Sequence, residues 1–288
     1  MASQEFRPLL EPKEGQAQAF DTVNAMRVSV KNGLKLRTLV VIGAVGQIIL
    51  LKLLPPRVAI LPATLLVLHS FITTAVQVAG ARHGKYQKAV VRGRSSAQLP
   101  DRETGAHGSD PAADSIVVFH VGVSFNHPLG PLGPGGKELG EQFKGVLDAL
   151  ERDPERYGVL GLTHWHGAVG DAKNTLLQIV YFRNLEGLHR FAHDAAHRTA
   201  WDFAARLGRM HGHFGFFHET FCVPRGSYET LYLNMPPTLL GNVRVPCPDA
   251  AGKGPPRLVS TLVSADHPNL KTMVNRMGRT SKDELASI

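Results

Sequence analysis

Histidines crowd the second half of the sequence, and their spacing suggests acid–base chemistry. The 288-residue chain has 14 histidines, and six of them lie between positions 189 and 218. His189, His193 and His197 are four residues apart, so on one helix they would share a face. Such a row can hold a metal ion. No carboxylate completes an HExxH motif, however, and we expect no metal.

A predicted strand carries further polar side chains, and strand alternation puts them on two different faces. Over residues 213–223, Phe217 and Glu219 share one face and His218 lies on the other. A histidine or glutamate in an aromatic interior is a good general acid or base, because burial and neighbours move its pKa towards neutrality. Each could equally be a core residue satisfied by a structural hydrogen bond.

A cation and an aromatic ring follow closely on the last histidine of the row. Arg198 comes directly after His197, and Trp201 one turn later, on the same predicted helix. An arginine in such a place can hold an anionic group or an oxyanion. It can equally be a solvated surface charge.

The elements that must position these side chains alternate as β-α-β-β-α-β. The pattern predicts strands over 115–126, 159–169, 174–182 and 213–223, a helix over 137–150, a long helix after Asn184, and an extended piece over 228–235. This order is the ferredoxin-like arrangement of an α+β domain, which we place at residues 115–241. Helices would cover one face of the sheet. Pairing two open faces closes a barrel, so we predict a homodimer.

An apolar block before this domain predicts a transmembrane helical hairpin. Residues 38–54 and 58–81 are apolar runs separated by Pro55 and Pro56, and proline cannot continue a helix. The second run is long enough to cross a bilayer, whereas the first is short. Lysines and arginines flank both outer ends, which places those ends in the cytosol. The alternatives are a single span beside a surface-lying segment, and two buried helices of a soluble protein.

Composition supports a membrane partner over nucleic acid. The formal net charge is +8, and many basic residues flank the apolar block, which suits lipid headgroups. No nucleic-acid-binding motif accompanies them, so we expect no nucleic acid. Two cysteines exclude a disulfide-built fold, and the polar first residues lack a cleaved signal peptide. We expect an endoplasmic reticulum membrane protein whose soluble domain faces the cytosol.

The remaining segments are predicted to carry little structure. Residues 1–37 are polar, residues 82–114 are basic and then rich in glycine, serine, proline and aspartate, and residues 242–288 have few apolar clusters. We therefore predict a mobile linker at 82–114 and a partly ordered tail at 242–288.

Four segments carry a resemblance to a known family: FNHPLGPLGPGGKELGEQF, YGVLGLTHW, FAHDAAHRTAWDF and HFGFFHETFCVPRGSYETLYLNMPP. Together they resemble a fungal monooxygenase-like family of secondary-metabolite pathways, which is related to the antibiotic-biosynthesis monooxygenases. More distantly, the segments are similar to haem-containing aldoxime dehydratases. The resemblance covers residues 115–241, and its HExF…YExxYxNMPP end is the most specific part.

The resemblance implies a dimeric α+β barrel that oxidises a lipophilic polyketide or terpenoid. Enzymes of the wider superfamily can use oxygen without metal or flavin, by deprotonating a substrate that then reduces oxygen itself. We therefore expect no cofactor, with haem as the alternative. No Rossmann glycine fingerprint is present, so a bound nicotinamide or flavin is not expected. The positions that match the family's motifs are His197, Arg198, Trp201, His218, Glu219, Glu229, Tyr232 and Asn234.

Chemistry alone suggests roles for these positions. We hypothesise that His218 or Glu219 is the base and that Arg198 or Asn234 stabilises an enolate. His197 completes the candidate catalytic set. The candidate substrate-binding residues are Trp165, Trp201, Phe217 and Tyr232. Two other interpretations stay open: a haem lyase with an axial histidine, for which His218 and His197 are the candidates, and a non-catalytic membrane-anchored accessory protein.

Overall fold

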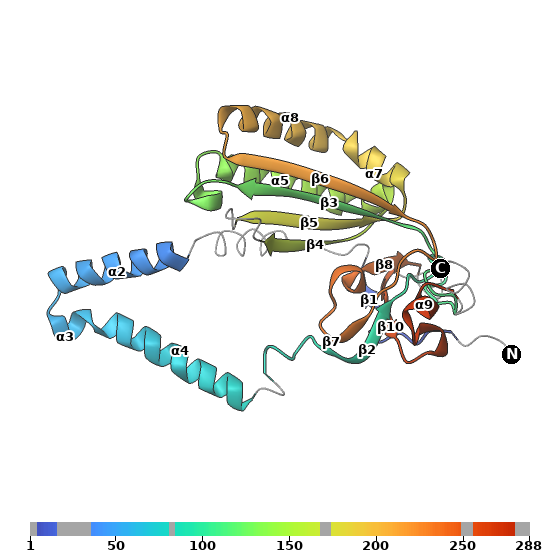
Figure 1. The fold of residues 1–288 in the computed structure, drawn as a ribbon, viewed down its shortest axis with the longest axis horizontal. Helices are drawn as coiled ribbons and strands as arrows, with labels where there is room; N and C mark the ends of the chain where they lie inside the picture. Colours follow the sequence, from blue (N-terminus) through green and yellow to red (C-terminus); the bar gives the residue numbers. More distant parts are fainter. Residues whose placement is uncertain (1–4, 16–35, 81–83, 168–173, 249–255, 280–288) are drawn as a thin grey trace.

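The computed structural model describes residues 5–15, 36–80, 84–167, 174–248 and 256–279. Figure 1 shows three parts: a pair of helices that project from the molecule, a four-stranded sheet with helices on one face, and a smaller group of strands beside that sheet. We call the last part the β unit.

The central sheet has the predicted ferredoxin-like topology. Its antiparallel strands lie in the order β4-β5-β3-β6. They span β3 Ile116–Phe125, β4 Val159–Gly167, β5 Thr175–Phe182 and β6 Phe214–Val223. All four predicted strands are confirmed. The last two positions predicted for the second strand, and the turn around Gly170, lie outside the described residues.

The helices on the sheet are amphipathic and bury their apolar stripes against it. They are α5 Gly136–Arg152, α6 Pro154–Tyr157, α7 Leu185–Ala192 and α8 Ala195–Met210. In α5, Leu139, Phe143, Leu147 and Leu150 recur at helical spacing. The core beneath the helices joins strand and helix residues: Val117, Phe119, Leu147, Leu150, Tyr157, Val159, Leu162, Val180, Phe182, Leu188 and Phe191.

The long helix predicted after Asn184 is in fact two helices. Asn184 caps α7 as predicted, its Oδ1 accepting from Gly187 N at 2.9 Å. Asp194 then caps a new helix, its Oδ1 accepting from Ala196 N at 2.9 Å. Tyr157 also donates to Asp194 Oδ2 at 2.8 Å. The break arises because the aspartate side chain takes over a backbone donor that a continuous helix would use.

The β unit consists of two three-stranded sheets ordered β1-β9-β8 and β10-β2-β7. Its strands are β1 Lys13–Glu14, β2 Val91–Ala97, β7 Tyr232–Met235, β8 Arg244–Cys247, β9 Arg257–Ser260 and β10 Leu262–Ser264, followed by the short helix α9 Met273–Arg276. The extended piece predicted at 228–235 is therefore partly confirmed, but its strand β7 pairs with β2 and not with the central sheet.

The predicted linker is wrong, and the predicted tail is more ordered than expected. Strand β2 lies inside 82–114, and β8 to β10 lie inside 242–288. The C-terminal part of the polar strand β2 is buried, because its polar groups are satisfied. Ser96 Oγ lies 3.1 Å from Thr230 Oγ1, which also accepts from Ala97 N at 2.7 Å. A strand with such partners lacks the apolar signature by which strands are predicted.

The β unit covers half of the sheet face that the helices leave open. Ile116, Leu160 and Tyr181 of the sheet pack with Val243 and Val245 of the β unit in one buried cluster. The approach is so close at Gly161 that a Cβ atom there would lie 2.7 Å from Val243 Cγ2. The face predicted to be open is thus half covered by the chain itself.

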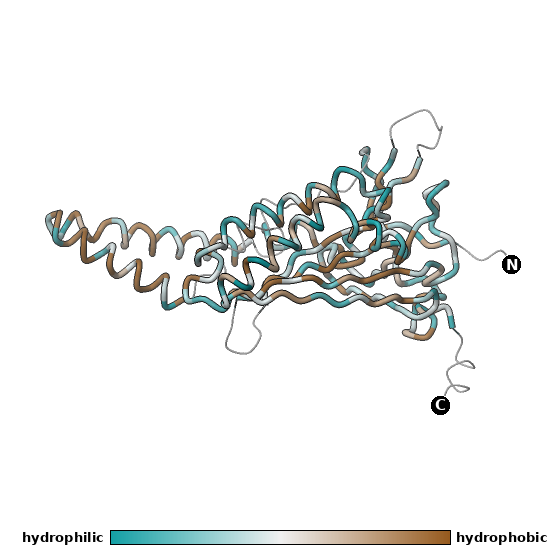
Figure 2. Tube along the Cα trace, turned by 90° about the horizontal axis from the view of Figure 1, so that it is seen from above, coloured by the Kyte–Doolittle hydropathy of each residue, from teal (hydrophilic) through white to brown (hydrophobic). Residues whose placement is uncertain are grey.

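The projecting pair comprises α2 Leu36–Leu53 and α4 Leu61–Ala79, joined through the short α3 Pro56–Ala59. The turn predicted at the prolines is therefore a short helix, and Gln47 Nε2 donates to Ala59 O at 3.1 Å beside it. Neither α2 nor α4 buries a residue. Figure 2 shows that both are apolar along most of their length. By length and composition, two helices could cross a membrane, Leu36–Leu53 and Pro56–Ala79.

Candidate functional site

The predicted catalytic residues separate onto the two faces of the central sheet. On β6, His218 pairs with Val121 and Glu219 with His120 of β3. Val121 packs against the helix-side core, so His218 points towards the helices. Glu219 points to the opposite, partly open face. His218 and Glu219 therefore cannot serve one site in one chain.

On the helix side, three predicted residues come together in what we call the helix-side cluster: His197, Trp201 and His218, with Phe119 and Phe191 beside them. The ring centroids of Trp201 and His218 lie 6.5 Å apart, and those of Phe119 and His218 lie 5.9 Å apart. His197 packs edge-on to Phe191 at 5.0 Å. The two phenylalanines were not predicted as site residues. Alternation along β3 puts the side chains of Phe119 and His120 on opposite faces of the sheet, and this signal could have identified Phe119.

His197 has the hydrogen bonding and electrostatics of a base. Its Nδ1 lies 3.1 Å from Ala192 O. A carbonyl only accepts, so Nδ1 must carry the proton and a neutral ring keeps its Nε2 lone pair. Burial lowers the pKa of His197 below its usual value, and the neighbouring His218 lowers it further. The imidazole is therefore neutral at pH 7 and can accept a proton through Nε2.

The other face carries Trp165, Phe217 and Glu219 on the half that the β unit leaves uncovered. The Glu219 carboxylate approaches the His120 ring, Oε2 to Nδ1 at 3.7 Å, and its side chain is largely exposed. Phe217 lies over Gly122, where a Cβ atom would meet its ring at 2.4 Å. This face is apolar and exposed, which suits an interface more than a reaction site.

Tyr232 and Asn234 on β7 are held in structural roles. The hydroxyl of Tyr232 accepts from Gly241 N at 3.1 Å within the buried contact between sheet and β unit. Asn234 has a φ of 50°, and its Oδ1 accepts from Gly93 N at 2.9 Å across the β2–β7 pair. Neither residue belongs to the helix-side cluster.

The remaining motif positions, Arg198 and Glu229, do not belong to the helix-side cluster either. Arg198 is exposed on the first turn of α8. Glu229 forms an ion pair with the buried Arg276, which anchors the end of the β unit.

The predicted histidine row is not a metal site. His189 lies in α7 and His197 in α8, with His193 at the break between them, so they do not share one helix face. Across the described ranges, no group of three or more histidine, cysteine, aspartate or glutamate side chains could hold a metal ion.

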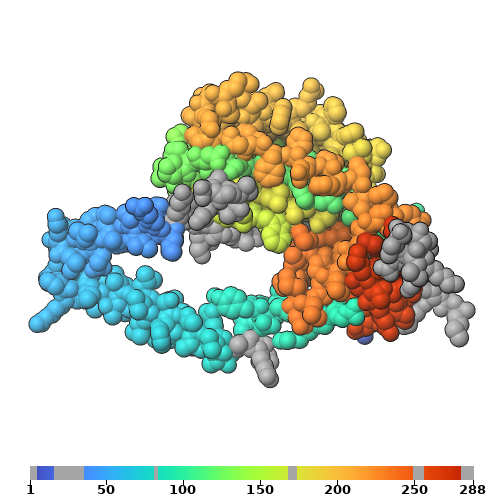
Figure 3. Space-filling model, in the orientation of Figure 1, coloured from blue at the N-terminus to red at the C-terminus, as the bar shows by residue number. Residues whose placement is uncertain are grey.

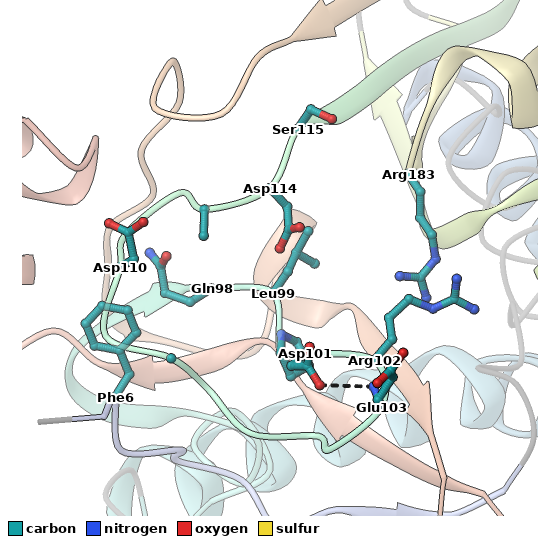
Figure 4. A pocket seen from close by; sticks show the side chains of 13 residues that line it. Phe6, Gln98, Leu99, Asp101, Arg102, Glu103, Asp110, Asp114, Ser115 and Arg183 are labelled. Atoms are coloured by element: carbon teal, nitrogen blue, oxygen red, sulfur yellow. Dashed lines mark hydrogen bonds between the residues drawn. The ribbon is translucent and has the colours of Figure 1, made fainter. Parts of the chain in front are cut away.

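A cavity of about 550 Å³ lies elsewhere, at the junction of the central sheet and the β unit. Figure 4 shows Asp101, Arg102, Asp114 and Arg183 around it. Burial raises the pKa of Asp114 and lowers that of Arg183. None of the predicted site residues lines this cavity, and its charged wall is a poor match for a lipophilic substrate.

Comparison of the chain with known proteins identifies its class as a family of monooxygenases. Residues 116–240 match the family model described as Monooxygenase af470-like, and the chain belongs to this family. A curated relative, Monooxygenase af470 of Aspergillus fumigatus, is 36% identical over 277 residues, covering 96% of this chain and 98% of its own length.

Solved structures with a similar local fold are more distant. A cofactor-independent oxygenase, SnoaB from Streptomyces nogalater, is 13% identical with a TM-score of 0.26, covering 38% of this chain and 92% of its own. An aldoxime dehydratase is 14% identical with a TM-score of 0.35, covering 65% of this chain and 45% of its own.

Proposed function

We propose that this protein is a membrane-anchored monooxygenase that oxidises a lipophilic secondary metabolite at the helix-side cluster. The observation that carries the proposal is His197, a neutral, half-buried base beside a second histidine and an aromatic wall. Such an arrangement suits removal of a proton from an activated carbon of an apolar substrate. Membership of the af470-like monooxygenase family supports the reaction class.

In this mechanism the substrate supplies the electrons. His197 Nε2 removes a proton from an activated CH₂ group, and a donor N–H of His218 stabilises the resulting enolate. The carbanion then reduces O₂. One oxygen atom becomes the new carbonyl oxygen, and the other leaves as water with the two substrate hydrogens. Trp201 provides an apolar surface for the substrate ring system.

Membrane anchoring follows from the exposed helices α2 and α4. An apolar helix that buries none of its residues is unstable in water, and a bilayer supplies the missing apolar environment. Basic residues at both outer ends favour a cytosolic soluble domain, and we propose the endoplasmic reticulum as the membrane. A substrate that partitions into lipid would be concentrated where the enzyme sits.

A homodimer is supported by the uncovered half of the sheet. Trp165 on the edge strand β4, and Phe217 and Phe221 on the edge strand β6, are exposed there. The unpaired backbone groups of an edge strand favour pairing with another chain. A second copy of the chain would bury these rings.

The test uses the full chain in nanodiscs, ¹⁸O₂ gas and a panel of polyketides and terpenoids that carry an activated CH₂ group. We expect one labelled oxygen per product by mass spectrometry. His197→Ala should lower turnover by at least about a hundredfold, whereas the exposed His189→Ala should not. Equal turnover of both variants would refute the assignment of His197.

A haem enzyme is the second candidate, because one side chain could hold the haem iron. With Nδ1 bonded to Ala192 O, His197 would keep Nε2 for the iron, since a metal-bound histidine commonly donates its other ring N–H to a carbonyl. Haem would supply the activation chemistry when bound. An absorption spectrum separates the two: a Soret band lost in His197→Ala indicates haem, and a colourless active protein excludes it.

A further inference from the structure

Exposed apolar side chains gather at one end of the central sheet. Leu129 and Leu132 lie on the loop directly after β3, and Met210 ends α8. They are 47%, 55% and 73% exposed. We call this group the leucine end. Large apolar side chains that stand together in water mark an interaction surface.

The leucine end is held in place by packing beneath it. His127 Nδ1 accepts from Leu129 N at 3.1 Å. Behind the loop, Phe125, Leu139, Leu207 and Phe214 form a small buried cluster. The exposed leucines are therefore presented by a folded loop, as an interface requires.

This end faces the same way as the base of the projecting helices. In Figure 1 the β3 arrow points towards the hairpin, and both α2 at its start and α4 at its end lie nearest the domain. Figure 2 shows from above that the apolar hairpin extends from one side of the molecule. In Figure 3 the green surface of the segment after β3 forms the side of the domain turned to the hairpin.

Basic and aromatic residues near the leucine end and the base of the hairpin suit a lipid headgroup region. Arg206 and Arg209 are exposed in the last turns of α8. At the base of the hairpin, Lys85 Nζ lies 5.0 Å over the ring of Tyr86, an exposed tyrosine of the kind that favours the membrane interface.

We propose that the leucine end rests on the membrane into which α2 and α4 insert, with Leu129, Leu132 and Met210 in the headgroup–acyl boundary. The proposal rests on the membrane anchoring proposed above. It adds the orientation of the domain. The ends of the strands at the leucine end contact the bilayer, and the helix-side cluster lies above the membrane surface on the side of the domain.

The orientation gives a lipophilic substrate a short path. Phe216 lies against α8, 4.0 Å from the position of a Cβ at Gly208. It is followed on the same face of β6 by His218, which contacts Trp201. Exposed aromatic rings thus lead from the leucine end to the helix-side cluster.

The test is depth-dependent quenching of a fluorophore on the full chain in vesicles. Cys222, the exposed native thiol, is first replaced by serine. A label is then attached at Leu132→Cys or, as control, at Met273→Cys. Met273 is equally exposed, at 57%, but belongs to the β unit. The vesicles contain neutral or anionic lipids with a spin label near the headgroup.

We expect strong quenching at position 132 and none at 273, in both lipid mixtures. Absence of quenching at 132, or equal quenching at both positions, would overturn the orientation. Flotation of the same sample separates this failure from that of anchoring. A chain that floats without quenching at 132 refutes the orientation alone, and a chain that does not float refutes both.

Discussion

Single residues determine which side of the sheet we propose as the reaction site. His218 and Glu219 are adjacent in the sequence but lie on opposite faces of β6. The helix side brings two histidines and a tryptophan together, and His197 is half-buried there. The sequence could predict the alternation, because it follows from strand geometry. It could not predict which side chains from the strand and the helices come together, since that depends on where α7 and α8 pack.

The pH dependence of turnover follows from the lowered pKa of His197. A general base must be neutral, and burial keeps this imidazole neutral below the usual histidine pKa of about 6.5. We therefore predict that the acid limb of kcat/KM lies below about pH 6.5. A limb at pH 7 or above, measured with a substrate that does not titrate, would contradict this assignment.

Asn234 should matter for stability and not for the chemical step. Its αL backbone and its bond to Gly93 N are structural. Asn234→Ala should lower the free energy of unfolding by about 1–2 kcal/mol, with turnover per folded molecule unchanged. Asn234→Gly, which tolerates the positive φ, should lose less. A fall in turnover without loss of stability would restore the enolate role first hypothesised for Asn234.

At the scale of elements, strands rich in apolar residues could be predicted from the sequence, whereas the polar strand and the helix break could not. The four sheet strands are rich in β-branched and aromatic residues, and all four were predicted. Strand β2 is polar and depends on partners such as Thr230, 133 residues away along the chain. The break between α7 and α8 depends on Asp194 acting as a cap. Such partnerships are set by tertiary contact, which local pattern does not encode.

The contact between sheet and β unit can be tested at one glycine. Gly161→Ala would place a Cβ 2.7 Å from Val243 Cγ2, so we expect a loss of about 1–3 kcal/mol of stability from overpacking. Gly167→Ala in the same strand meets nothing within 4 Å and serves as the control. Equal denaturant midpoints for both variants would show that the β unit does not pack there.

The β unit should also make stability depend on pH. His107 is buried, and burial lowers its pKa. In the unfolded chain this histidine takes up a proton near pH 6.5, whereas in the folded protein it stays neutral to a lower pH. Protonation therefore favours the unfolded state, and the free energy of unfolding falls as pH drops from 7 towards 5. His107→Gln should reduce this pH dependence, and the exposed His189→Gln should not. An unchanged slope in His107→Gln would contradict the account.

At the scale of the whole molecule, the parts form a catalytic domain carried by an apolar hairpin. The hairpin was predicted from the sequence, because two long apolar runs need no tertiary context to be recognised. The orientation that we propose for the domain was not predicted, since it rests on the loop after β3 and on the end of α8.

Integration into a bilayer should be sensitive to charge in α4. Leu66, 70% exposed near the middle of the apolar span Pro56–Ala79, should face lipid, so Leu66→Arg costs about 2.5–3.5 kcal/mol of insertion. We expect less protein in the floating fraction and more released by alkaline washing. Met273→Arg should behave like the unchanged chain. Full integration of Leu66→Arg would contradict the membrane assignment of α4.

The most direct measurement of the central claim compares turnover of His197→Ala with that of Glu219→Gln, using ¹⁸O incorporation and equal amounts of folded protein. The account predicts a loss of at least about a hundredfold for His197→Ala and near-normal turnover for Glu219→Gln. The reverse result would place the chemistry on the other face of the sheet and contradict the helix-side site.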